Sequence, residues 1–351
     1  MAFRVLIVDD SMLVRQIVGD VLRRIPDVEV VGEARNGKIG LELLESLKPD
    51  LVILDIEMPV LDGLSMLEEK RKLGNKTPVM MLSSLTQAGA HITMQALESG
   101  AMEFVPKPAG DTGIRLEDLE HQIETKVTGL VLSLKEKSSP PPKPSKGLRL
   151  QGPHKLRLAL IGASTGGPQS LQEIFTHIAS SFPLPIVVVQ HMPPIFTAAF
   201  AQRLNRVSGL TVFEAESGQV LLPGHAYVAP GGKHLDFQKK GDALSIIVDG
   251  ESPPLNAHRP SVDFTLHKAI DHLAGEILAV IMTGMGRDGV EALVRLHEAG
   301  GVVLAQDEAS SIVYGMNRRA IEAGAVDEIL PLKELAGRMV EISARIQGRS
   351  A

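Results

Sequence analysis

The chain contains no cysteine, which excludes disulfide bonds, thiolate metal sites and a cysteine nucleophile. It also lacks long hydrophobic runs, because no stretch approaches the roughly 18 uninterrupted apolar residues that a membrane-spanning helix needs. The apolar start of MAFRVLIVDDS ends at Asp9 and Asp10 after a few residues, so we expect neither a signal peptide nor a membrane anchor there. These absences predict a cytoplasmic protein without membrane insertion.

An excess of positive charge is missing as well. The net charge is −6, which argues against a general nucleic-acid binder, since such proteins are more often basic on one face. Hydrophobic residues make up 44% of the 351 residues and charged residues 22%, a balance typical of globular proteins. A chain of this length is expected to form about two domains.

One segment, residues 135–155, has a composition that cannot form a core. It contains five prolines, six Lys or Arg residues and a single Glu. Such a segment favours an extended, solvated form. We interpret it as the core of a linker over 126–155, which separates a first domain at 1–125 from a second domain at 156–347.

Short apolar runs alternate with helical patterns on both sides of the linker. This alternation predicts α/β domains with parallel sheets covered on both faces. The first domain is expected to have five strands, at 3–10, 28–34, 50–56, 77–84 and 102–108. The second, doubly wound and mostly parallel, is expected to have strands at 156–163, 185–191, 210–215, 226–230, 244–248, 276–284, 301–307 and 326–332. The short strands around 210–248 are expected to be partly antiparallel or a hairpin.

Three acidic side chains follow two of the strands in the first domain: Asp9 and Asp10 end the first, and Asp55 ends the third. The carboxyl ends of parallel strands form a ligand crevice, where these carboxylates would repel one another unless a cation such as Mg²⁺ lies among them. Each aspartate taken alone is better explained as a helix cap. Ser83 after the fourth strand and Lys107 after the fifth favour a phosphoryl site on the same rim.

The motifs VDDS, LDIEMPVLDGL, MLSSLT and FVPKP together resemble the response-regulator receiver domain, over roughly residues 1–125. The resemblance implies a flavodoxin-like fold that a histidine kinase phosphorylates on Asp55, with Mg²⁺ as cofactor. It also implies a cis peptide bond between Lys107 and Pro108. The other implied roles are Mg²⁺ binding by Asp9, Asp10, Asp55 and the backbone carbonyl of Glu57, phosphoryl contact by Ser83 and Lys107, and an aromatic switch at Phe104.

After the linker, IGASTGGPQS (161–170) places a small-residue turn between an expected strand and an expected helix. Such a turn can cradle a phosphate on backbone N–H groups, or it can present Ser164 as a nucleophile in a G-x-S-x-G pattern. The glycines fit neither dinucleotide nor P-loop fingerprints, which weakens the first interpretation. A nucleophilic serine needs a base and an orienting carboxylate. His191 and Asp288 follow strands at the same sheet edge, although each alone has an ordinary structural explanation.

The chain order of these residues is Ser, His, Asp, which is not the Ser, Asp/Glu, His order of α/β-hydrolases. With IGASTGG, QHMPPIFT, LPGHAYVAPGGKH, AHRPSVD, MTGMGRDG and AQDEASSIVYGM, residues 156 to about 330 resemble the chemotaxis-type protein-glutamate methylesterases. The resemblance implies Ser164 as nucleophile, His191 as general base and acid, and Asp288 as the group that orients the imidazole. It also implies the backbone N–H of Met285 as oxyanion donor and an esterase step without a cofactor. Asn317 stands where the family pattern has proline, which we expect to affect a turn.

The combined resemblance predicts an enzyme that hydrolyses glutamate γ-methyl esters on methyl-accepting chemotaxis receptors, releases methanol and also deamidates certain glutamines. We expect the unphosphorylated first domain to cover the Ser164 edge and phosphorylation of Asp55 to weaken that contact. A monomer that binds no nucleic acid is the default expectation. The rival functions are a DNA-binding response regulator, which would need a basic helix-turn-helix, a nucleotide-binding module using Gly162–Gly167, and an inactive adaptor that docks to a receptor.

Overall fold

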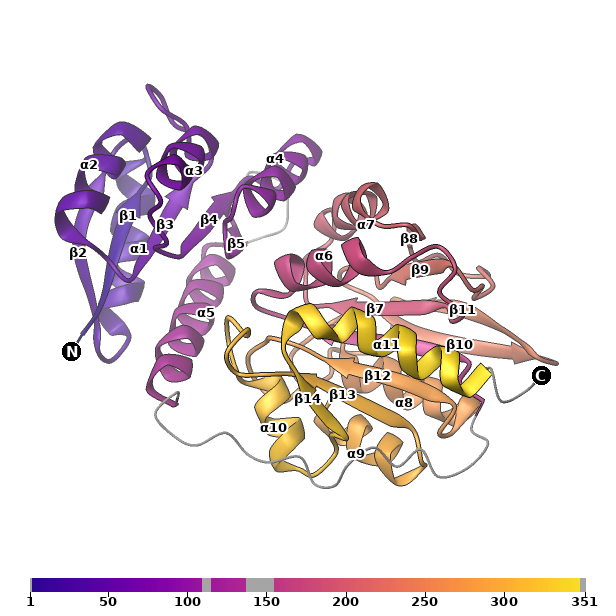
Figure 1. Cartoon of the computed structure of the whole chain (residues 1–351). Coiled ribbons are helices and arrows are strands. Elements are labelled where there is room, and N and C mark those ends of the chain that lie inside the picture. Colours follow the sequence, from indigo (N-terminus) through magenta and orange to yellow (C-terminus); the bar gives the residue numbers. More distant parts are fainter. Residues whose placement is uncertain (1, 109–114, 137–154, 348–351) are drawn as a thin grey trace. The chain divides into compact units, whose positions relative to one another are not determined.

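The computed structural model describes residues 2–108, 115–136 and 155–347. The chain divides into two compact units, Met1–Ser138 and Ser139–Ala351. Each unit is an α/β fold built on a parallel sheet (Figure 1), which confirms the expected fold class. In the described ranges no helix is both long enough and apolar enough to cross a membrane.

The sheet of the N-terminal unit has five parallel strands in the order β2-β1-β3-β4-β5. The strands are β1 (Phe3–Val8), β2 (Val28–Ala34), β3 (Leu51–Asp55), β4 (Val79–Ser83) and β5 (Glu103–Pro106). Every residue of β3, β4 and β5 is buried, because helices cover both faces of the sheet. This burial explains why these strands appear in the sequence as continuous apolar runs.

Helices cover this sheet, and α1 packs beside α5 while α2 packs beside α3. They are α1 (Met12–Arg24), α2 (Gly37–Leu47), α3 (Gly63–Lys72), α4 (Gln87–Glu98) and α5 (Leu116–Glu136). A side-chain oxygen caps each of the first four by accepting a backbone N–H of the first turn. The caps are Ser11, Asn36, Asp62 and Thr86.

Helix α5 continues past residue 125, where the sequence predicted the end of the first domain. Leu119, Ile123, Val127 and Leu130 are buried and lie on one face of the helix. Because this apolar spacing continues, the helix continues with it, and the first residues of the expected linker are helical. Most of the Pro- and Lys-rich core of that linker lies outside the described residues.

In the C-terminal unit, seven parallel strands form one sheet in the order β14-β13-β12-β6-β7-β9-β8. They are β6 (Leu158–Ala163), β7 (Ile186–Gln190), β8 (Thr211–Glu214), β9 (His225–Val228), β12 (Ile277–Ile281), β13 (Val302–Gln306) and β14 (Glu328–Leu330). A separate antiparallel hairpin joins β10 (His234–Lys240) to β11 (Ala243–Asp249). The sequence did not predict β10, whose last three residues are exposed and polar and therefore give no apolar run.

Helices lie on both faces of this sheet, as in a doubly wound fold (Figure 1). They are α6 (Gly167–His177), α7 (Phe196–Val207), α8 (Val262–Leu273), α9 (Val290–Glu298), α10 (Met316–Glu322) and α11 (Leu332–Gln347). α6 packs against α7 and α11, whereas α8 packs against α9 and the β10–β11 hairpin.

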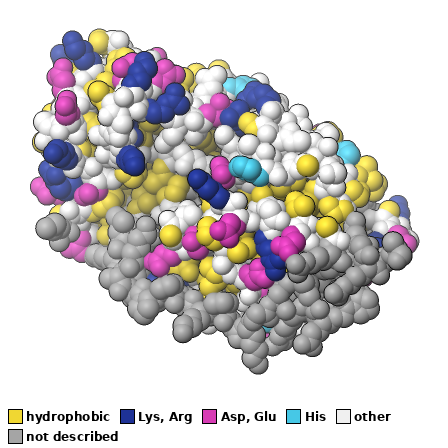
Figure 2. Space-filling model, in the orientation of Figure 1, with side chains coloured by type: hydrophobic (Ala, Val, Ile, Leu, Met, Phe, Trp, Pro, Cys, Tyr) yellow, Lys and Arg dark blue, Asp and Glu magenta, His cyan; other side chains and the backbone are white. Residues whose placement is uncertain are grey.

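On the face shown in Figure 2, basic side chains are interspersed with acidic ones.

Strand β6 lies where the strand order of the seven-stranded sheet reverses. The chain passes from β6 to β7 on one side, and later it places β12 on the other side of β6. Ligand sites of open parallel sheets form beside such a point, outside the carboxyl ends of the strands. The segments that follow β6, β7 and β12 therefore meet at one edge, and each carries one of the three residues expected to form a triad.

Candidate functional site

The N-terminal unit brings Asp9, Asp10 and Asp55 together at the carboxyl ends of β1 and β3. One carboxylate oxygen of each residue lies within 4.8 Å of the others. Asp9 and Asp55 are buried, whereas Asp10 is exposed. Lys107 follows β5, and its Nζ lies 2.9 Å from Asp9 Oδ2 and 2.8 Å from Asp55 Oδ1. The structure thus places four of the expected receiver residues in one cluster.

The groups of this cluster shift the pKa values of Asp55 and Lys107. The pKa of Asp55 is raised to about 6: burial raises it most, the charge of Asp9 also raises it, and Lys107 offsets part of this increase. Burial lowers the pKa of Lys107, but the charges and hydrogen bonds of Asp55 and Asp9 raise it above its ordinary value. One ammonium group therefore compensates three carboxylates only in part.

The donor set of this cluster fits Mg²⁺. Mg²⁺ prefers oxygen ligands and is held by one or two carboxylates together with waters and phosphate oxygens. Asp9, Asp10 and Asp55 offer such oxygens at one place, and the single ammonium group of Lys107 faces these three carboxylates. A divalent cation would relieve that imbalance.

The remaining residues expected in this site lie around the cluster. Ser83 ends β4, is buried, and shares a hydrogen bond with the Thr93 hydroxyl of α4. Phe104 on β5 is buried, and Lys126 Nζ of α5 lies 6.0 Å from the centroid of its ring. The side chain of Glu57 is exposed and accepts a hydrogen bond from Ser84 Oγ at 3.3 Å. Ser83 and Phe104 are therefore held by neighbouring helices.

The expectation of a cis peptide bond between Lys107 and Pro108 was wrong. Among the described residues, the cis peptide bond of this structure is Arg259–Pro260. A trans bond is the intrinsically favoured form before proline, and with it Lys107 Nζ already contacts both Asp9 and Asp55.

Ser164 lies directly after β6, in the turn that leads into α6. Its backbone N–H donates to Thr283 O at 3.0 Å, and its carbonyl oxygen accepts from Gly167 N at 2.8 Å and from Gln190 Nε2 at 2.9 Å. Gly166 has a φ of 76°, which a side chain would disfavour. These contacts hold the turn so that the hydroxyl of Ser164 faces the end of β7.

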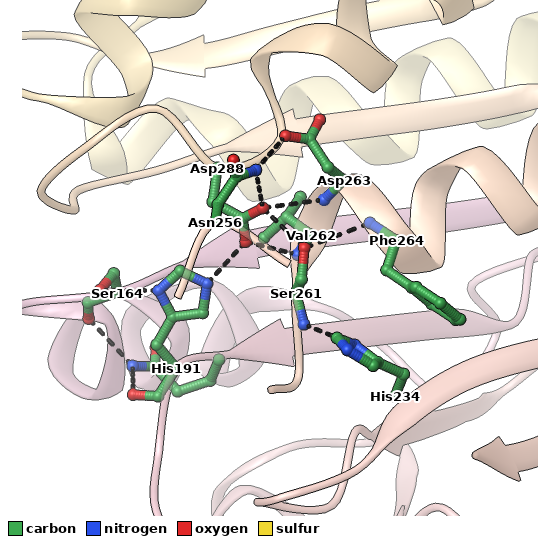
Figure 3. A network of polar contacts seen from close by, with 10 residues as sticks. Ser164, His191, His234, Asn256, Ser261, Val262, Asp263, Phe264 and Asp288 are labelled. Carbon is green, nitrogen blue, oxygen red and sulfur yellow. Dashed lines mark hydrogen bonds and ion pairs between the residues drawn. The ribbon is translucent and has the colours of Figure 1, made fainter. Parts of the chain in front are cut away.

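His191 connects Ser164 to Asp288 (Figure 3). Its Nδ1 lies 3.1 Å from Ser164 Oγ, and its Nε2 lies 2.8 Å from Asp288 Oδ2. Because a carboxylate only accepts, Nε2–H donates to Asp288, and the lone pair of Nδ1 is left to accept from the serine. In the chymotrypsin arrangement the two ring nitrogens are used the other way round. The structure thus brings together all three residues expected to form the triad.

The carboxylate of Asp288 lies at the N-terminus of helix α8. It accepts hydrogen bonds from the backbone N–H groups of Val262 at 2.6 Å and Asp263 at 3.2 Å, and from Ser261 Oγ at 2.7 Å. Free N–H groups and the helix dipole make such a terminus a site for an anion. Burial raises the pKa of Asp288, but hydrogen bonds from His191, Ser261 and Asn256 and the charge of His191 lower it well below its usual range.

A second layer of polar contacts supports this carboxylate. Asn256 Nδ2 donates to Asp288 Oδ1 at 3.0 Å and to Asp263 Oδ2 at 2.7 Å (Figure 3). Ser261 N–H donates to His234 Nδ1 at 3.3 Å, and His234 is fully buried. Asp288 is therefore ionised, fixed in orientation and shielded from water.

Gly284 brings the loop of Met285 onto Ser164. A Cβ at position 284 would lie 2.8 Å from Ser164 Cβ and 2.4 Å from Met316 Sδ, so a larger residue would push the loop away. Met285 is half-buried, and Gly286 follows it with a φ of 89°. Gly284 therefore allows the loop of Met285 to lie close to Ser164.

Sequence reasoning missed Asn256, Ser261 and His234. Ser261 has the sequence signature of a helix N-cap, and it does cap α8 by accepting from Phe264 N at 3.2 Å. Nothing in the sequence connects that cap to Asp288, which is 27 residues away. His234 ends the motif LPGHAYVAPGGKH, but nothing in that motif assigns it a role, and Asn256 carries no local signal.

Comparison with known proteins agrees with this geometry. Residues 159–339 match the CheB methylesterase family, and residues 5–117 match the response regulator receiver domain. The chain belongs to the CheB methylesterase family.

Two relatives are similar to this chain over nearly their whole length. Both are named protein-glutamate methylesterase/protein-glutamine glutaminase. The one from Xanthomonas campestris pv. campestris is 41% identical over 97% of this chain and 98% of its own. The one from Nitrosomonas europaea is 41% identical over 98% of this chain and 96% of its own.

A crystal structure of the Thermotoga maritima CheB methylesterase catalytic domain is also similar. It is 42% identical, covers 54% of this chain and 99% of its own chain, and has a TM-score of 0.52. The receiver domain of this family member implies phosphorylation that depends on Mg²⁺ and a histidine kinase as phosphodonor in general terms.

Asn317 lies in the first turn of α10. It is fully buried, and its Nδ2 donates to Gln306 O at 2.9 Å and to Ser311 Oγ at 2.8 Å. The first turn of a helix accommodates proline because its N–H groups have no partner within the helix. The side-chain amide of Asn317 instead hydrogen-bonds the first turn of α10 to the end of β13.

Proposed function

We propose that this chain is a phosphorylation-activated esterase that hydrolyses glutamate γ-methyl esters on chemoreceptors. The observation that carries the proposal is the contact series from Ser164 Oγ to His191 Nδ1 and from His191 Nε2 to Asp288 Oδ2, at 3.1 Å and 2.8 Å. The names of the relatives support the substrate. The catalytic domain of the proposal spans 156–347, and the reaction takes place in the cytoplasm.

In the proposed first step, Ser164 Oγ attacks the carbonyl carbon of the methyl ester while His191 Nδ1 takes the hydroxyl proton. Asp288 stabilises the imidazolium that forms, since it is already ionised and accepts from Nε2. The backbone N–H of Met285 donates to the oxyanion. A donor of this kind is typically worth roughly 2.7–4 kcal/mol of transition-state stabilisation.

The intermediate then collapses to an acyl-enzyme. The methoxy group leaves and takes the proton from His191 Nδ1, so that methanol is released and the glutamyl carbonyl is esterified to Ser164. A water molecule attacks this ester, His191 accepts its proton, and Ser164 leaves with that proton. Glutamate is regenerated, and the proposed steps use only protein groups and water.

We extend the proposal to deamidation of selected receptor glutamines. An amide and an ester pass through similar tetrahedral intermediates, so the same three residues serve both reactions. The leaving group is then ammonia, which receives its proton from His191 Nδ1. The second half of the relatives' name, protein-glutamine glutaminase, supports this activity.

Control of the esterase is assigned to the N-terminal unit. In the proposal, Asp55 accepts a phosphoryl group from a histidine kinase, and Asp9, Asp10, Asp55 and the Glu57 carbonyl hold Mg²⁺. The ion would supply positive charge that neutralises part of the negative charge of the site. Lys107 contacts Asp55 and is placed to pair with the phosphoryl group, and release of Ser83 from Thr93 would free a second phosphoryl contact.

The test measures methanol release from membranes that contain methylated receptors. The full-length chain and Ser164→Ala are each assayed with and without a small phosphodonor plus Mg²⁺. Release that requires Ser164 and rises with the phosphodonor is the expected result. No release from the wild-type chain under either condition would overturn the esterase proposal and favour an adaptor that only docks to a receptor.

A further inference from the structure

A tight turn at Leu255–His258 lies beside the triad. Leu255 N–H donates to His258 O at 3.1 Å, and His258 N–H donates to Leu255 O at 2.9 Å. The two residues between them have positive φ values, 53° at Asn256 and 64° at Ala257. Two consecutive left-handed residues closed by two hydrogen bonds are the signature of a type I′ turn, which usually has glycine at its second central position.

The turn adopts this conformation at an energetic cost. Asparagine tolerates the left-handed region, but alanine is disfavoured there because its Cβ approaches the carbonyl oxygen. Backbone strain of this kind persists only where surrounding contacts require it, and it clusters at functional sites. In this turn, the contacts that maintain the strained backbone are made by the side chains of Asn256 and His258, on either side of Ala257.

Asn256 contacts the orienting carboxylate of the triad. Its Nδ2 donates to Asp288 Oδ1 at 3.0 Å and to Asp263 Oδ2 at 2.7 Å. Asp263 is buried, and its Oδ1 accepts from Ala292 N at 2.8 Å in the first turn of α9. A single amide therefore joins Asp288 to the start of the helix that follows it in the chain.

His258 contacts the base of the triad. Its imidazole stacks on that of His191 with 3.7 Å between ring centroids and 15° between ring planes. The edges of the His191 ring are engaged by Ser164 and Asp288, and His258 covers one of its faces. Rotation of the His191 ring out of its plane would bring it into collision with His258.

We propose that the turn Leu255–His258 is a positioning element for the esterase, in which Asn256 orients Asp288 and His258 restricts rotation of the His191 ring. The inference rests on the function proposed above. The turn contributes little to the core, because Leu255 is 39% exposed and His258 is half-buried. Its effect on the chemical step should therefore exceed its effect on stability.

The test compares four variants of the full-length chain. His258→Ala removes the stacked ring, His258→Phe keeps a flat ring, Asn256→Ala removes the amide, and Ala257→Gly is the matched control within the turn. For His258→Ala we expect kcat of methanol release to fall by about ten- to a hundredfold with KM unchanged, since small misplacements of reacting groups have effects of this size. We expect His258→Phe to restore most of kcat, and Ala257→Gly to match the wild type because glycine adopts positive φ freely.

A second readout does not depend on the receptor. The Nε2 proton of His191, hydrogen-bonded to Asp288, should give a low-field imidazole resonance in proton NMR spectra of the wild-type chain. We expect the resonance to broaden or disappear in His258→Ala and Asn256→Ala and to persist in His258→Phe and Ala257→Gly. Thermal unfolding midpoints identify any variant that fails to fold, and His258→Leu, which fills the space without a flat ring, then replaces His258→Ala.

Two outcomes would overturn the inference. One is a His258→Ala variant that retains both kcat and the resonance, and the other is a His258→Phe variant that is folded yet as impaired as His258→Ala. Absence of methanol release from the wild-type chain would instead contradict the proposed function. In that case the inference is tested only by the His191 Nε2 proton resonance of the variants.

Discussion

Asp55 and Asp288 both lie at the carboxyl edge of a parallel sheet, and both are buried, yet their surroundings shift their pKa values in opposite directions. Burial and neighbouring Asp9 raise the pKa of Asp55 to about 6, and Lys107 offsets this only in part. For Asp288, the effect of burial is outweighed by hydrogen bonds and by the charge of His191. The backbone N–H groups at the start of α8 also donate to this carboxylate.

The difference corresponds to two kinds of chemistry. The carboxylate of Asp288 is fully satisfied by its neighbours, so it is suited to orient and stabilise a histidine and not to react. Asp55 lies in a cluster that still has unneutralised negative charge, so it is suited to bind a cation and to accept an electrophilic phosphorus. Similar positions in similar sheets thus acquire different roles through their hydrogen-bond donors.

The largest effect is expected from removal of the nucleophile. Ser164→Ala should lower methanol release by a factor on the order of 10⁶, as for serine nucleophiles in other triads. Phosphorylation of Asp55, measured by incorporation of radioactive phosphate, should be unchanged. Ser170→Ala is the matched control, since it removes a buried serine from α6 and should retain activity. Substantial release by Ser164→Ala would contradict the assignment of the nucleophile.

Asp288→Asn should lower kcat by about 10⁴-fold, because an amide favours the wrong tautomer of the histidine it contacts. KM should change little, since Asp288 is 1% exposed and does not meet the substrate. Steady-state assays of methanol release separate the two constants. A loss of less than about tenfold would show that Asp288 does not orient His191 during the reaction.

Asp55→Asn should abolish stimulation of methanol release by the phosphodonor and leave the unstimulated rate intact. The physical reason is that an amide cannot form the acyl phosphate, while the esterase residues lie in a different unit of the chain. Asp62→Asn, which changes the cap of α3, is a control that should remain responsive. Continued stimulation of Asp55→Asn would place the phosphorylated residue elsewhere.

The smallest predicted effect concerns stability as a function of pH. Because the pKa of Asp55 is raised from 3.8 to about 6, the folded state binds its proton more tightly than the unfolded state. Stability should therefore fall as pH rises from about 4 to about 6, by on the order of 3 kcal/mol, and level off above that range. Asp55→Asn should lack this component.

Calorimetric unfolding of the wild-type chain and Asp55→Asn in the presence of a chelator measures this component. The contribution of Asp288 depends on pH in the opposite sense. Its pKa is lowered from 3.8, so its carboxylate stabilises the folded state above pH 3.8, and this stabilisation is lost as pH falls below that value. The stability difference between the wild-type chain and Asp288→Asn should accordingly shrink in acid. Parallel pH profiles for the two variants would contradict the comparison.

Much of the fold could be predicted from the sequence because buried parallel strands are continuous apolar runs. β3, β4 and β7 lie within the predicted ranges. The sequence did not predict β10, whose exposed last residues are polar. Helix α5 continues past residue 125 on an apolar face that the pattern already contained. The trans bond at Lys107 could not be predicted, because tertiary contacts decide an isomer whose intrinsic energy difference is small.

The sequence by itself determined which groups of the candidate sites stand at strand ends: the aspartates of the first unit, and Ser164, His191 and Asp288 of the second. Strand ends are local features, and parallel pairing brings them to one edge. Only the tertiary structure decided how these groups behave. Asn256 and Ser261 reach Asp288 across 32 and 27 residues, and His258 stacks on His191 through a strained turn. A pKa or a ring orientation depends on burial and on donors from distant segments, which folding alone brings together.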